Sequence, residues 1–373
     1  MSRPPHIAHY LSLAAFIGFL GFAWLIYIFR PGTPPSPQSF PAINWEFLDP
    51  VPAKIDQWWA ANYGGKEALS AQYHQLNSDL KKLSPLPQQV VMGQEGWLFH
   101  AQKPIAQFRN KLRFSDYELS VLRRKLQERI SAYQQLGAHF QLFIFPNKAQ
   151  VYPEHLPPYV RQGPGQSQAE QVVDLVNELA GAKAYYLRDV LKAAKPKGRL
   201  YDKTDTHWND RGAFEAYQYI IRELAISFPS TGTPRPIEDF QISEFATEGR
   251  NLARMLGMSD QYEEQAVGFT PQFPLEAKVH MPYQIAAPRD FIFADLYFMG
   301  FQHPKAQGPK ILFIRDSFGT QLIEELSEHF KESYYLWDQW RYASNQGIVN
   351  QVKPEAVVII MLEEHLGNLL RFD

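Results

Sequence analysis

From about residue 112 onward, short apolar runs alternate with stretches whose apolar residues recur at helical spacing. This alternation is typical of an α/β domain, in which helices pack against a sheet. Helices are expected at 115–136, 168–179, 210–225 and 320–330, and strands at 140–145, 184–187, 310–314, 334–336 and 356–361. Ser115 followed three residues later by Glu118 predicts a capping box at the first helix. The pattern therefore constrains most of the chain to a layered fold around a central sheet.

Two regions differ from this alternation. Residues 229–309 contain nine prolines and show weak periodicity. Because prolines interrupt both helices and sheet strands, we expect an insertion or lobe of the main domain there, rather than a separate domain. Residues 94–99 have the pattern of a hairpin turn that leads into a strand.

The N-terminal region predicts a membrane anchor. Residues 7–29 form a stretch of 23 residues without Asp, Glu, Lys or Arg, which is long enough to span a bilayer. A cleaved signal peptide would end at small residues, whereas this stretch ends in bulky ones. Five prolines follow within residues 31–41 and favour an extended spacer. We expect a short cytoplasmic head and transmembrane anchor at 1–30, a Pro-rich spacer at 31–60 and the catalytic domain at 61–373.

Charge and composition exclude some classes of function. The 373 residues carry a formal net charge of −2 at pH 7. Their densest basic clusters, at 81–82 and 123–125, are too small for a nucleic-acid groove, so we expect no nucleic-acid partner. The chain has no cysteine, which excludes disulfides and thiol catalysis.

Two short segments concentrate the chemistry. Asp205 and His207 lie two residues apart, and such residues face the same side of an extended segment. Ser317 follows the apolar run at 311–314 and precedes a helical pattern. It is therefore expected just beyond the carboxyl end of a strand, where open α/β sheets bind ligands. The three side chains supply a nucleophile, a base and an orienting carboxylate, as a serine acyl-transfer site requires.

Simpler interpretations of these residues stay open. Ser317 on its own is equally a helix N-cap, and His207 a surface residue beside a local Asp cap. Asp202 and Asp210 are rivals of Asp205 for the orienting role. Asp and His also bind metals, but no third and fourth ligand occur at a clustered spacing. We therefore predict neither a metal nor a cofactor.

Four further residues are candidates for contact with substrate. Lys148 follows the strand at 140–145 at the same edge of the sheet, although solvation of a loop would explain it equally well. Trp208, Trp337 and Trp340 could offer stacking faces to sugar rings. With an aromatic content of 14%, however, many such rings must belong to the core.

Several motifs carry a resemblance to a known family. They are GQEGWLF at 93–99, FPNKAQVYPEHLP at 145–157, YDKTDTHWNDRGA at 201–213 and FIRDSFG at 313–319, with looser echoes in RNLARMLGM at 250–258 and EEHLGNL at 363–369. With these motifs the chain resembles the SGNH-hydrolase-like proteins of bacterial exopolysaccharide O-acetylation, the AlgX/AlgJ type known from alginate. The resemblance spans about residues 90–373, and the Asp-Thr-His-Trp segment is its most specific part.

The resemblance implies a fold and a site. The fold would be a three-layer α/β domain with a central, mostly parallel sheet, preceded by one N-terminal transmembrane helix. Ser317 would accept the acyl group, His207 would be the base, and Asp205 its partner. Esterases of the wider group commonly carry Gly-Asp-Ser, whereas here Arg315 takes the place of the glycine. The expected oxyanion donors are the backbone amides of Ser317, Phe318 and Gly319.

The resemblance also implies a function. We expect a membrane-anchored O-acetyltransferase that acts on a secreted polysaccharide. Its acetyl group would come from a membrane-bound O-acyltransferase, and other exopolysaccharide assembly proteins would be further partners. The expected location is the inner membrane, in a single pass, with the catalytic domain in the periplasm. The sequence leaves open an acetylesterase with the same site, or a non-catalytic polysaccharide-binding subunit of an acetylation complex.

Overall fold

The computed structural model describes residues 88–289, 291, 293–338 and 346–371. These residues belong to one unit of the chain, Leu80–Asp373. The apolar stretch at 7–29 and the Pro-rich spacer lie outside the described residues, so the anchor stays a prediction. Within the described ranges, no helix has the length and apolar character needed to cross a membrane.

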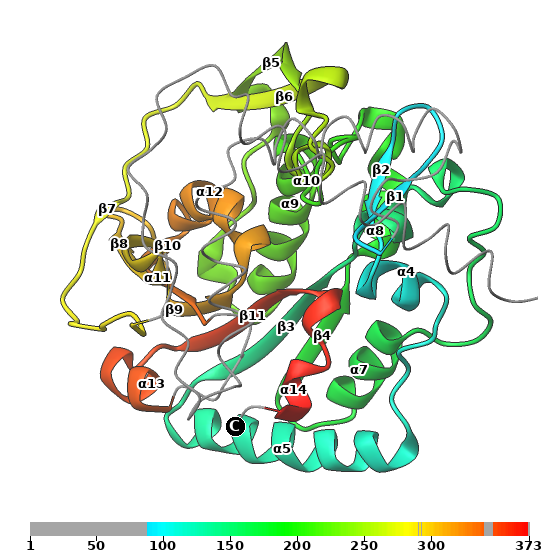
Figure 1. The fold of residues 1–373 in the computed structure, drawn as a ribbon. Coiled ribbons are helices and arrows are strands. Elements are labelled where there is room, and N and C mark those ends of the chain that lie inside the picture. The colour runs from blue at the N-terminus through cyan, green and yellow to red at the C-terminus, as the bar shows by residue number, and fades with distance from the viewer. Residues whose placement is uncertain (1–87, 290, 292, 339–345, 372–373) are drawn as a thin grey trace, which may run out of the picture. The chain divides into compact units, whose positions relative to one another are not determined.

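A seven-stranded sheet forms the middle of the unit (Figure 1). Its strands are β3 (His139–Phe145), β4 (Ala182–Tyr186), β7 (Lys278–Val279), β8 (Phe298–Gln302), β9 (Gly308–Arg315), β10 (Phe330–Trp337) and β11 (Ala356–Leu362). The strand order is β4-β3-β11-β9-β10-β8-β7. The first five strands in this order run parallel, while β8 pairs antiparallel with β10 and with β7. The prediction of a central, mostly parallel sheet is therefore confirmed.

Helices cover both faces of this sheet. The longer ones are α5 (Asp116–Gln135), α7 (Gln168–Asn177), α8 (Arg188–Ala194) and α9 (Asp210–Ser227). Successive strand residues point to opposite faces, and in β3 Leu142 and Ile144 pack with α5 and α7, whereas Phe143 and Phe145 pack with α8 and α9. The unit is thus a three-layer α/β/α fold. The shorter helices are α4 (Lys103–Phe108), α6 (Lys148–Val151), α10 (Asn251–Met255), α11 (Ala294–Tyr297), α12 (Ile323–Ser327), α13 (Gln346–Val352) and α14 (Asn368–Arg371).

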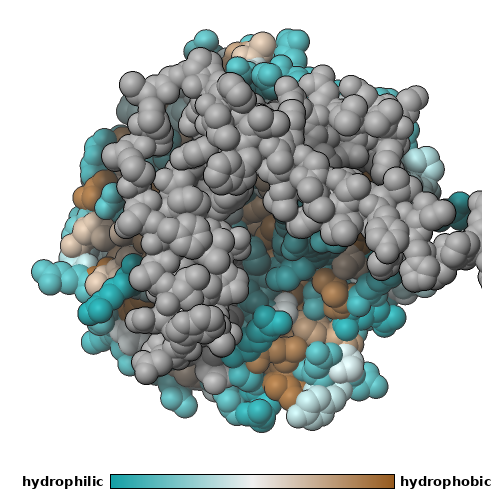
Figure 2. Space-filling model, viewed as in Figure 1, coloured by the Kyte–Doolittle hydropathy of each residue, from teal (hydrophilic) through white to brown (hydrophobic). Residues whose placement is uncertain are grey.

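The outer surface of the α5 and α7 layer is mainly polar. Figure 2 shows mostly hydrophilic residues, with a few hydrophobic ones among them, at the lower right of the view, where Figure 1 places α5 and α7. This is the surface expected of helices that bury one apolar stripe against a sheet.

The carboxyl ends of the parallel strands meet at one edge. Leu362 at the end of β11 pairs with Phe145 at the end of β3, and Ile360 of β11 pairs with Arg315 at the end of β9. Since these strands are parallel, the segments that follow them lie along the same edge of the sheet. The sheet thereby gathers residues that are far apart in the sequence.

Local sequence signals predicted most helix boundaries correctly. Ser115 and Glu118 form the predicted capping box at the start of α5. Asn209 caps α9, where its side chain accepts a hydrogen bond from the Gly212 amide at 3.1 Å. The helix predicted at 320–330 is present in part, as the end of a 3-10 helix and the short α12, but its predicted end was wrong, because α12 ends at Ser327 and β10 begins at Phe330. The apolar residues there continue into a buried strand, which short-range spacing cannot distinguish from a buried helix.

The region at 229–309 contributes in two ways. Its first part contains α10 and a two-stranded antiparallel sheet of β5 (Phe240–Glu248) and β6 (Glu263–Pro271). Its second part contains β7 and β8, which extend the central sheet. The region is therefore partly continuous with the main sheet instead of lying wholly over it. The predicted hairpin is also present, as β1 (Val90–Met92) and β2 (Leu98–His100).

Candidate active site

Ser317 begins a 3-10 helix, η6 (Ser317–Leu322), directly after β9 and Asp316. The Asp316 carboxylate is fully buried and accepts a hydrogen bond from the Phe318 amide at 2.9 Å. It also accepts one from the Leu362 amide at 2.7 Å and lies 3.1 Å from Nδ1 of His365. Asp316 therefore ties the turn that carries Ser317 to the end of β11.

The three residues of the predicted site lie together. Asp205 Oδ1 lies 2.9 Å from His207 Nδ1 and also accepts the His207 backbone amide at 2.9 Å. On the other side of the ring, His207 Nε2 lies 3.0 Å from Ser317 Oγ, across a sequence separation of 110 residues. The imidazole is 35% exposed and the Asp205 side chain 15%. A small molecule can therefore approach the His–Ser end, while the carboxylate is shielded.

The environment of Asp205 fixes its charge. Burial alone would raise the pKa of Asp205, but the hydrogen bonds and the positive charge of His207 outweigh burial and lower that pKa to about 2. An ionised carboxylate only accepts hydrogen bonds, so Nδ1 carries the proton toward Asp205. In the neutral ring, Nε2 is then an acceptor facing the Ser317 hydroxyl.

Two of the expected oxyanion donors are engaged within the protein. The Phe318 amide donates to the Asp316 carboxylate, and the Gly319 amide donates to the Asp316 carbonyl at 3.2 Å. Their prediction as oxyanion donors was therefore wrong for this structure, because the turn uses both amides to close on itself. Of the three predicted amides, that of Ser317 is the one not bonded to Asp316.

Arg315, which replaces the glycine of Gly-Asp-Ser, is a fully buried part of the turn. Its guanidinium donates to the Asp316 carbonyl at 3.1 Å, to Thr320 Oγ1 at 3.0 Å and to the Leu296 carbonyl at 3.0 Å. It also lies 4.8 Å from the centre of the Trp337 ring. The arginine therefore links both ends of the Ser317 turn to the neighbouring strand and helix.

Residues from the 229–309 region hold the turn that carries the Asp–His pair. Glu264 of β6 is completely buried and accepts from the Thr204 amide at 2.9 Å and from Thr204 Oγ1 at 2.8 Å. Arg199 forms an ion pair with the same carboxylate at 2.8 Å. Asn251 of α10 accepts from the Thr206 amide at 2.9 Å. Asn251 lies in the stretch RNLARMLGM at 250–258, one of the looser matches to the family, whereas nothing in the sequence indicated a role for Glu264.

The two rival carboxylates have other partners. Asp202 forms an ion pair with Arg250 at 3.1 Å, and burial raises the pKa of Asp202 to about 6. Asp210 accepts from the Gln321 side chain at 2.9 Å and from the Phe269 amide at 3.0 Å. Of the three candidates, Asp205 is the one whose carboxylate contacts the imidazole.

Three of the four predicted substrate contacts face the protein interior, and the fourth is not described. Lys148 is 4% exposed, its ammonium donates to backbone carbonyls, and burial lowers its pKa to about 7. Trp208 packs against Phe318 and the end of β3, and Trp337 packs against Arg315 and Phe293. Both indoles are buried and present no free face to a sugar. Trp340 lies outside the described residues.

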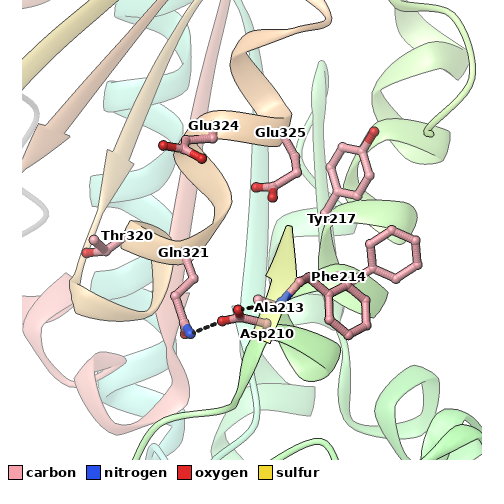
Figure 3. Close-up of a pocket in the computed structure, with 9 residues that line it drawn as sticks. Asp210, Ala213, Phe214, Tyr217, Thr320, Gln321, Glu324 and Glu325 are labelled. Atoms are coloured by element: carbon pink, nitrogen blue, oxygen red, sulfur yellow. Dashed lines mark hydrogen bonds between the residues drawn. The ribbon is translucent and has the colours of Figure 1, made fainter. Parts of the chain in front are cut away.

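A cavity of about 230 Å³ lies between α9 and the η6–α12 segment. Its lining includes three carboxylates, of Asp210, Glu324 and Glu325, and the aromatic ring of Phe214. Figure 3 shows the Gln321 amide reaching the Asp210 carboxylate, with Glu325 above them. Burial raises the pKa of Glu325 to about 7. Within the described ranges, no three His, Asp or Glu side chains are grouped as metal ligands would be.

A family model agrees with these observations. The model described as "SGNH hydrolase-like domain, acetyltransferase AlgX" matches residues 90–278, slightly more than half of the chain. Asp205 and His207 lie within the matched residues, whereas Ser317 lies beyond them.

Curated relatives match a shorter part of the chain. The probable alginate O-acetylase AlgJ of Pseudomonas syringae pv. tomato is 30% identical over 149 residues, which are 39% of this chain and 36% of that protein. The protein of the same name from Pseudomonas putida is 29% identical over 194 residues, 50% of this chain and 43% of that protein. In both cases the matched segment spans less than half of the relative's length.

A solved structure shares the fold. Bacillus cereus PatB1, determined with a sulfonyl adduct, is similar over 76% of this chain and 98% of that chain, with a TM-score of 0.57 and 17% sequence identity. At this identity the likeness concerns the fold alone. From the match over residues 90–278, the chain belongs to the family of AlgX-type SGNH hydrolase-like acetyltransferase domains.

Proposed function

We propose that this protein is an O-acetyltransferase that acetylates hydroxyls of a secreted polysaccharide, with Ser317 as nucleophile. The observation that carries the proposal is the hydrogen-bonded series Asp205–His207–Ser317, with separations of 2.9 and 3.0 Å. Such a series activates a serine hydroxyl by giving its proton an acceptor of fixed orientation. The names of the two relatives, both probable alginate O-acetylases, support acetyl transfer to a polysaccharide.

In the first half of the reaction, Ser317 Oγ attacks the carbonyl carbon of an acetyl donor while His207 Nε2 takes the hydroxyl proton. The negative charge that develops on the carbonyl oxygen is stabilised by the Ser317 amide, the one of the three expected amides that is not bonded to Asp316. Collapse of the tetrahedral intermediate breaks the bond to the donor oxygen, which leaves with the proton from His207. The product is an acetyl ester on Ser317.

In the second half, a sugar hydroxyl attacks the acetyl carbon of this ester. His207 Nε2 accepts the proton of the attacking hydroxyl and then returns a proton to Ser317 Oγ as the ester bond breaks. Throughout, the ionised Asp205 holds the ring in one tautomer and stabilises the imidazolium that forms twice in each cycle.

The test is covalent labelling of the full-length protein with p-nitrophenyl acetate, followed by mass spectrometry. We expect wild type to gain one acetyl group on Ser317, and Ser317→Ala and His207→Ala to gain none at this site while they still fold. Turnover by Ser317→Ala equal to that of wild type would refute the proposal. A protein that binds polysaccharide but is never acetylated would instead be a binding subunit.

An acetylesterase is the second candidate, and one observation favours it. The His207 side chain is 35% exposed, so water can reach Nε2 in place of a sugar hydroxyl. The two activities differ only in the acceptor that attacks acetyl-Ser317. Incubation with donor and polysaccharide separates them, because a transferase produces acetylated polymer, whereas an esterase releases acetate at the same rate with or without polymer.

We also propose the cellular setting of the reaction. The chain would be held in the inner membrane by residues 7–29, which lie outside the described residues, with the catalytic unit in the periplasm. Because acetyl-CoA is cytosolic, a membrane-bound O-acyltransferase would pass the acetyl group across the membrane to Ser317. Other exopolysaccharide assembly proteins would present the polymer.

A further inference from the structure

The base of the Lys148 side chain is fixed at the carboxyl edge of the sheet. Lys148 is the first residue of α6 and follows β3 by way of Asn147, which caps α6 by accepting the Ala149 amide at 3.0 Å. The Asn147 amide in turn donates to Glu363 Oε1 at 2.8 Å. The cap by Asn147 and its hydrogen bond to Glu363, just after β11, thus fix where the lysine begins.

The ammonium group of Lys148 uses all its donors on the protein. Nζ lies 3.0 Å from the carbonyl oxygen of Asp202, 2.8 Å from that of Lys203 and 2.5 Å from that of Asp205. An ammonium has three N–H donors, so the three carbonyls occupy them all. The rings of Trp97 and Phe99 lie 5.6 and 5.4 Å away, adding cation–π contacts. No donor is left for a substrate.

The hydrogen bond from the Lys148 ammonium to the Asp205 carbonyl differs from those to the carbonyls of Asp202 and Lys203. The Lys203 carbonyl also accepts the Leu98 amide at 2.9 Å, and the Asp202 carbonyl lies 3.5 Å from the Asp205 amide. The turn is held in addition by Thr204, through Glu264. The Asp205 carbonyl belongs to the very residue whose carboxylate must meet His207, so its direction affects the geometry of the Asp–His pair.

We propose that Lys148 is a positioning residue that orients Asp205 toward His207 by gathering the three carbonyls of this turn. The inference rests on the proposed function, because it assigns Lys148 a role in activating Ser317. The turn retains its other attachments without the lysine. Its loss is therefore expected to misalign the Asp–His pair in a protein that still folds.

The first experiment compares Lys148→Met with wild type in Ser317-dependent hydrolysis of p-nitrophenyl acetate by the full-length protein, after subtraction of the Ser317→Ala rate. Methionine keeps the unbranched shape of the side chain, shortened by one atom, and removes the three donors. We expect kcat to fall about 100-fold, as a displacement of about 1 Å can do, while KM stays within about twofold. Lys195→Met is the matched control, because Lys195 also contacts a carbonyl, of Val151, and an aromatic ring, of Tyr152; its kcat should match wild type.

Two results would overturn the inference. An unchanged kcat would show that Asp205 needs no help from the lysine. A tenfold rise in KM at full kcat would show that Lys148 contacts substrate after all. Either result requires Ser317-dependent turnover. If Ser317→Ala were as active as wild type, the proposed function itself would fail, which separates the two failures.

A double-mutant cycle with Asp205→Asn tests whether Lys148 acts through Asp205. If it does, Lys148→Met should lower kcat less than about threefold in the Asp205→Asn background, because there is no longer an orienting carboxylate to misplace. If Lys148→Met lowered kcat by the same factor in wild type and in the Asp205→Asn background, a positioning role would be contradicted.

The pH profile gives a readout that a purely structural role would not move. The charged groups around Lys148 are Asp205, Glu264, Asp202 and Arg199, and the lysine charge is one of the influences that lower the pKa of Asp205. Removing this positive charge makes protonation of the hydrogen-bonded Asp–His pair as a unit easier, so the acidic limb of kcat/KM should shift to higher pH in Lys148→Met. Lys148→Gln, which retains two donors, covers the case in which the methionine variant does not fold. Failure of both to fold would also overturn the inference, since Lys148 would then serve the fold itself.

Discussion

Three carboxylates near the site, all largely shielded from solvent, differ in charge because their partners differ. Asp205 faces an imidazole, and its pKa is lowered to about 2. Burial raises the pKa of Asp202 to about 6, although Arg250 is its ion-pair partner. Burial also raises the pKa of Glu363 to about 7, and its partners, the Asn147 amide and the Tyr186 hydroxyl, are neutral. The same type of side chain thus serves as a fixed anion or as a group that titrates near neutrality.

Replacing Asp205 by asparagine should strongly impair catalysis. Asparagine can donate to Nδ1 and favour the wrong tautomer, so we expect kcat for p-nitrophenyl acetate to fall about 1,000-fold or more, as in serine triads. Asp210→Asn is the matched control and should stay within about threefold of wild type, because the Asp210 carboxylate contacts Gln321 and Phe269 instead. Equal losses in the two variants would argue against Asp205 as the orienting group.

The depressed pKa of Asp205 also has a consequence for stability. A carboxylate with a folded-state pKa of about 2 contributes stability fully above its ordinary value of 3.8 and loses it as the pH falls through about 2. Asp205 should therefore stay ionised throughout the neutral range. We therefore expect this loss of folding stability only in strongly acidic solution, and none between pH 5 and 8.

Glu363 should have the opposite pH dependence. Its raised pKa means that its stabilising contribution is complete below pH 4.5 and is lost as the pH rises through about 7. In Glu363→Gln, which mimics the protonated form, the fall in unfolding free energy between pH 4.5 and 8 should be smaller by up to about 3 kcal/mol. Urea unfolding at several pH values measures this difference. In Glu364→Gln, at the partly exposed neighbour, the fall should persist and move only slightly to lower pH, because the Glu364 charge is the smallest of the influences on the pKa of Glu363. Identical profiles for wild type and Glu363→Gln would refute the prediction.

At the scale of elements, the strand-to-helix turn after β9 is held by close packing. Gly319 has no room for a side chain, since a Cβ there would lie 2.8 Å from Ile360 Cδ1 and 2.9 Å from Arg315 Cβ. The glycine is therefore required by the approach of η6 to the sheet, and not by an oxyanion contact of its amide. Arg315 also holds this turn through the three hydrogen bonds of its guanidinium.

Gly319→Ala should accordingly destabilise the protein by about 1–3 kcal/mol, the usual cost of overpacking, and lower kcat by moving Ser317. Chemical denaturation and ester hydrolysis measure the two effects. Gly347→Ala in α13 is the control, since nothing lies within 4 Å of the added Cβ. An alanine inside a helix should there stabilise by up to about 1 kcal/mol. The prediction fails if the two alanine variants are equally stable.

The strand β6 supports the Asp–His turn through Glu264. In Glu264→Gln the Arg199 guanidinium would lose one of its two buried anionic partners, the other being Asp202, and we expect a loss of about 3 kcal/mol in unfolding free energy, together with lower kcat. Thermal unfolding and acetyl-ester turnover are the measurements. Glu263→Gln, at an exposed neighbour on the same strand, should behave as wild type. Wild-type stability of Glu264→Gln would show that the turn does not depend on β6.

At the scale of the whole molecule, the parallel sheet brings together the ends of strands that are distant in sequence. Ser317 follows β9, Asn147 and Lys148 follow β3, and Glu363 follows β11, all at one edge. The Asp–His turn reaches this edge between α8 and α9. The 229–309 region joins the same assembly by extending the sheet through β8 and by holding the turn through β6 and α10.

The predicted anchor can be tested on the whole chain. Removal of residues 1–30 should release the protein from the membrane fraction, because no helix in the described ranges could replace that stretch as a span. Cell fractionation with an antibody against the catalytic unit measures the release. Replacing three apolar residues within 7–29 by lysine should act in the same way, whereas replacing three by leucine should not. Full membrane retention without residues 1–30 would refute the anchor.

The sequence by itself determined the local elements and the identity of the reacting groups. Capping boxes, helical spacing and buried apolar runs report on neighbours within a few residues, and they predicted α5, α7, α9, β3 and β11. Motifs identified Asp205, His207 and Ser317 as candidates, and the structure gives them a hydrogen-bonded geometry. Their catalytic roles stay predictions until the variants are measured.

The tertiary structure decided which groups these residues and their neighbours contact. It directed the amides of Phe318 and Gly319 to Asp316, turned Lys148 toward the Asp–His turn and buried Trp208 and Trp337 in packed layers. It also paired Glu264 with Thr204, which lies 60 residues away. A local pattern contains no information about such contacts, because hydrogen-bond partners and burial are set by segments that meet only when the sheet and its helices pack together.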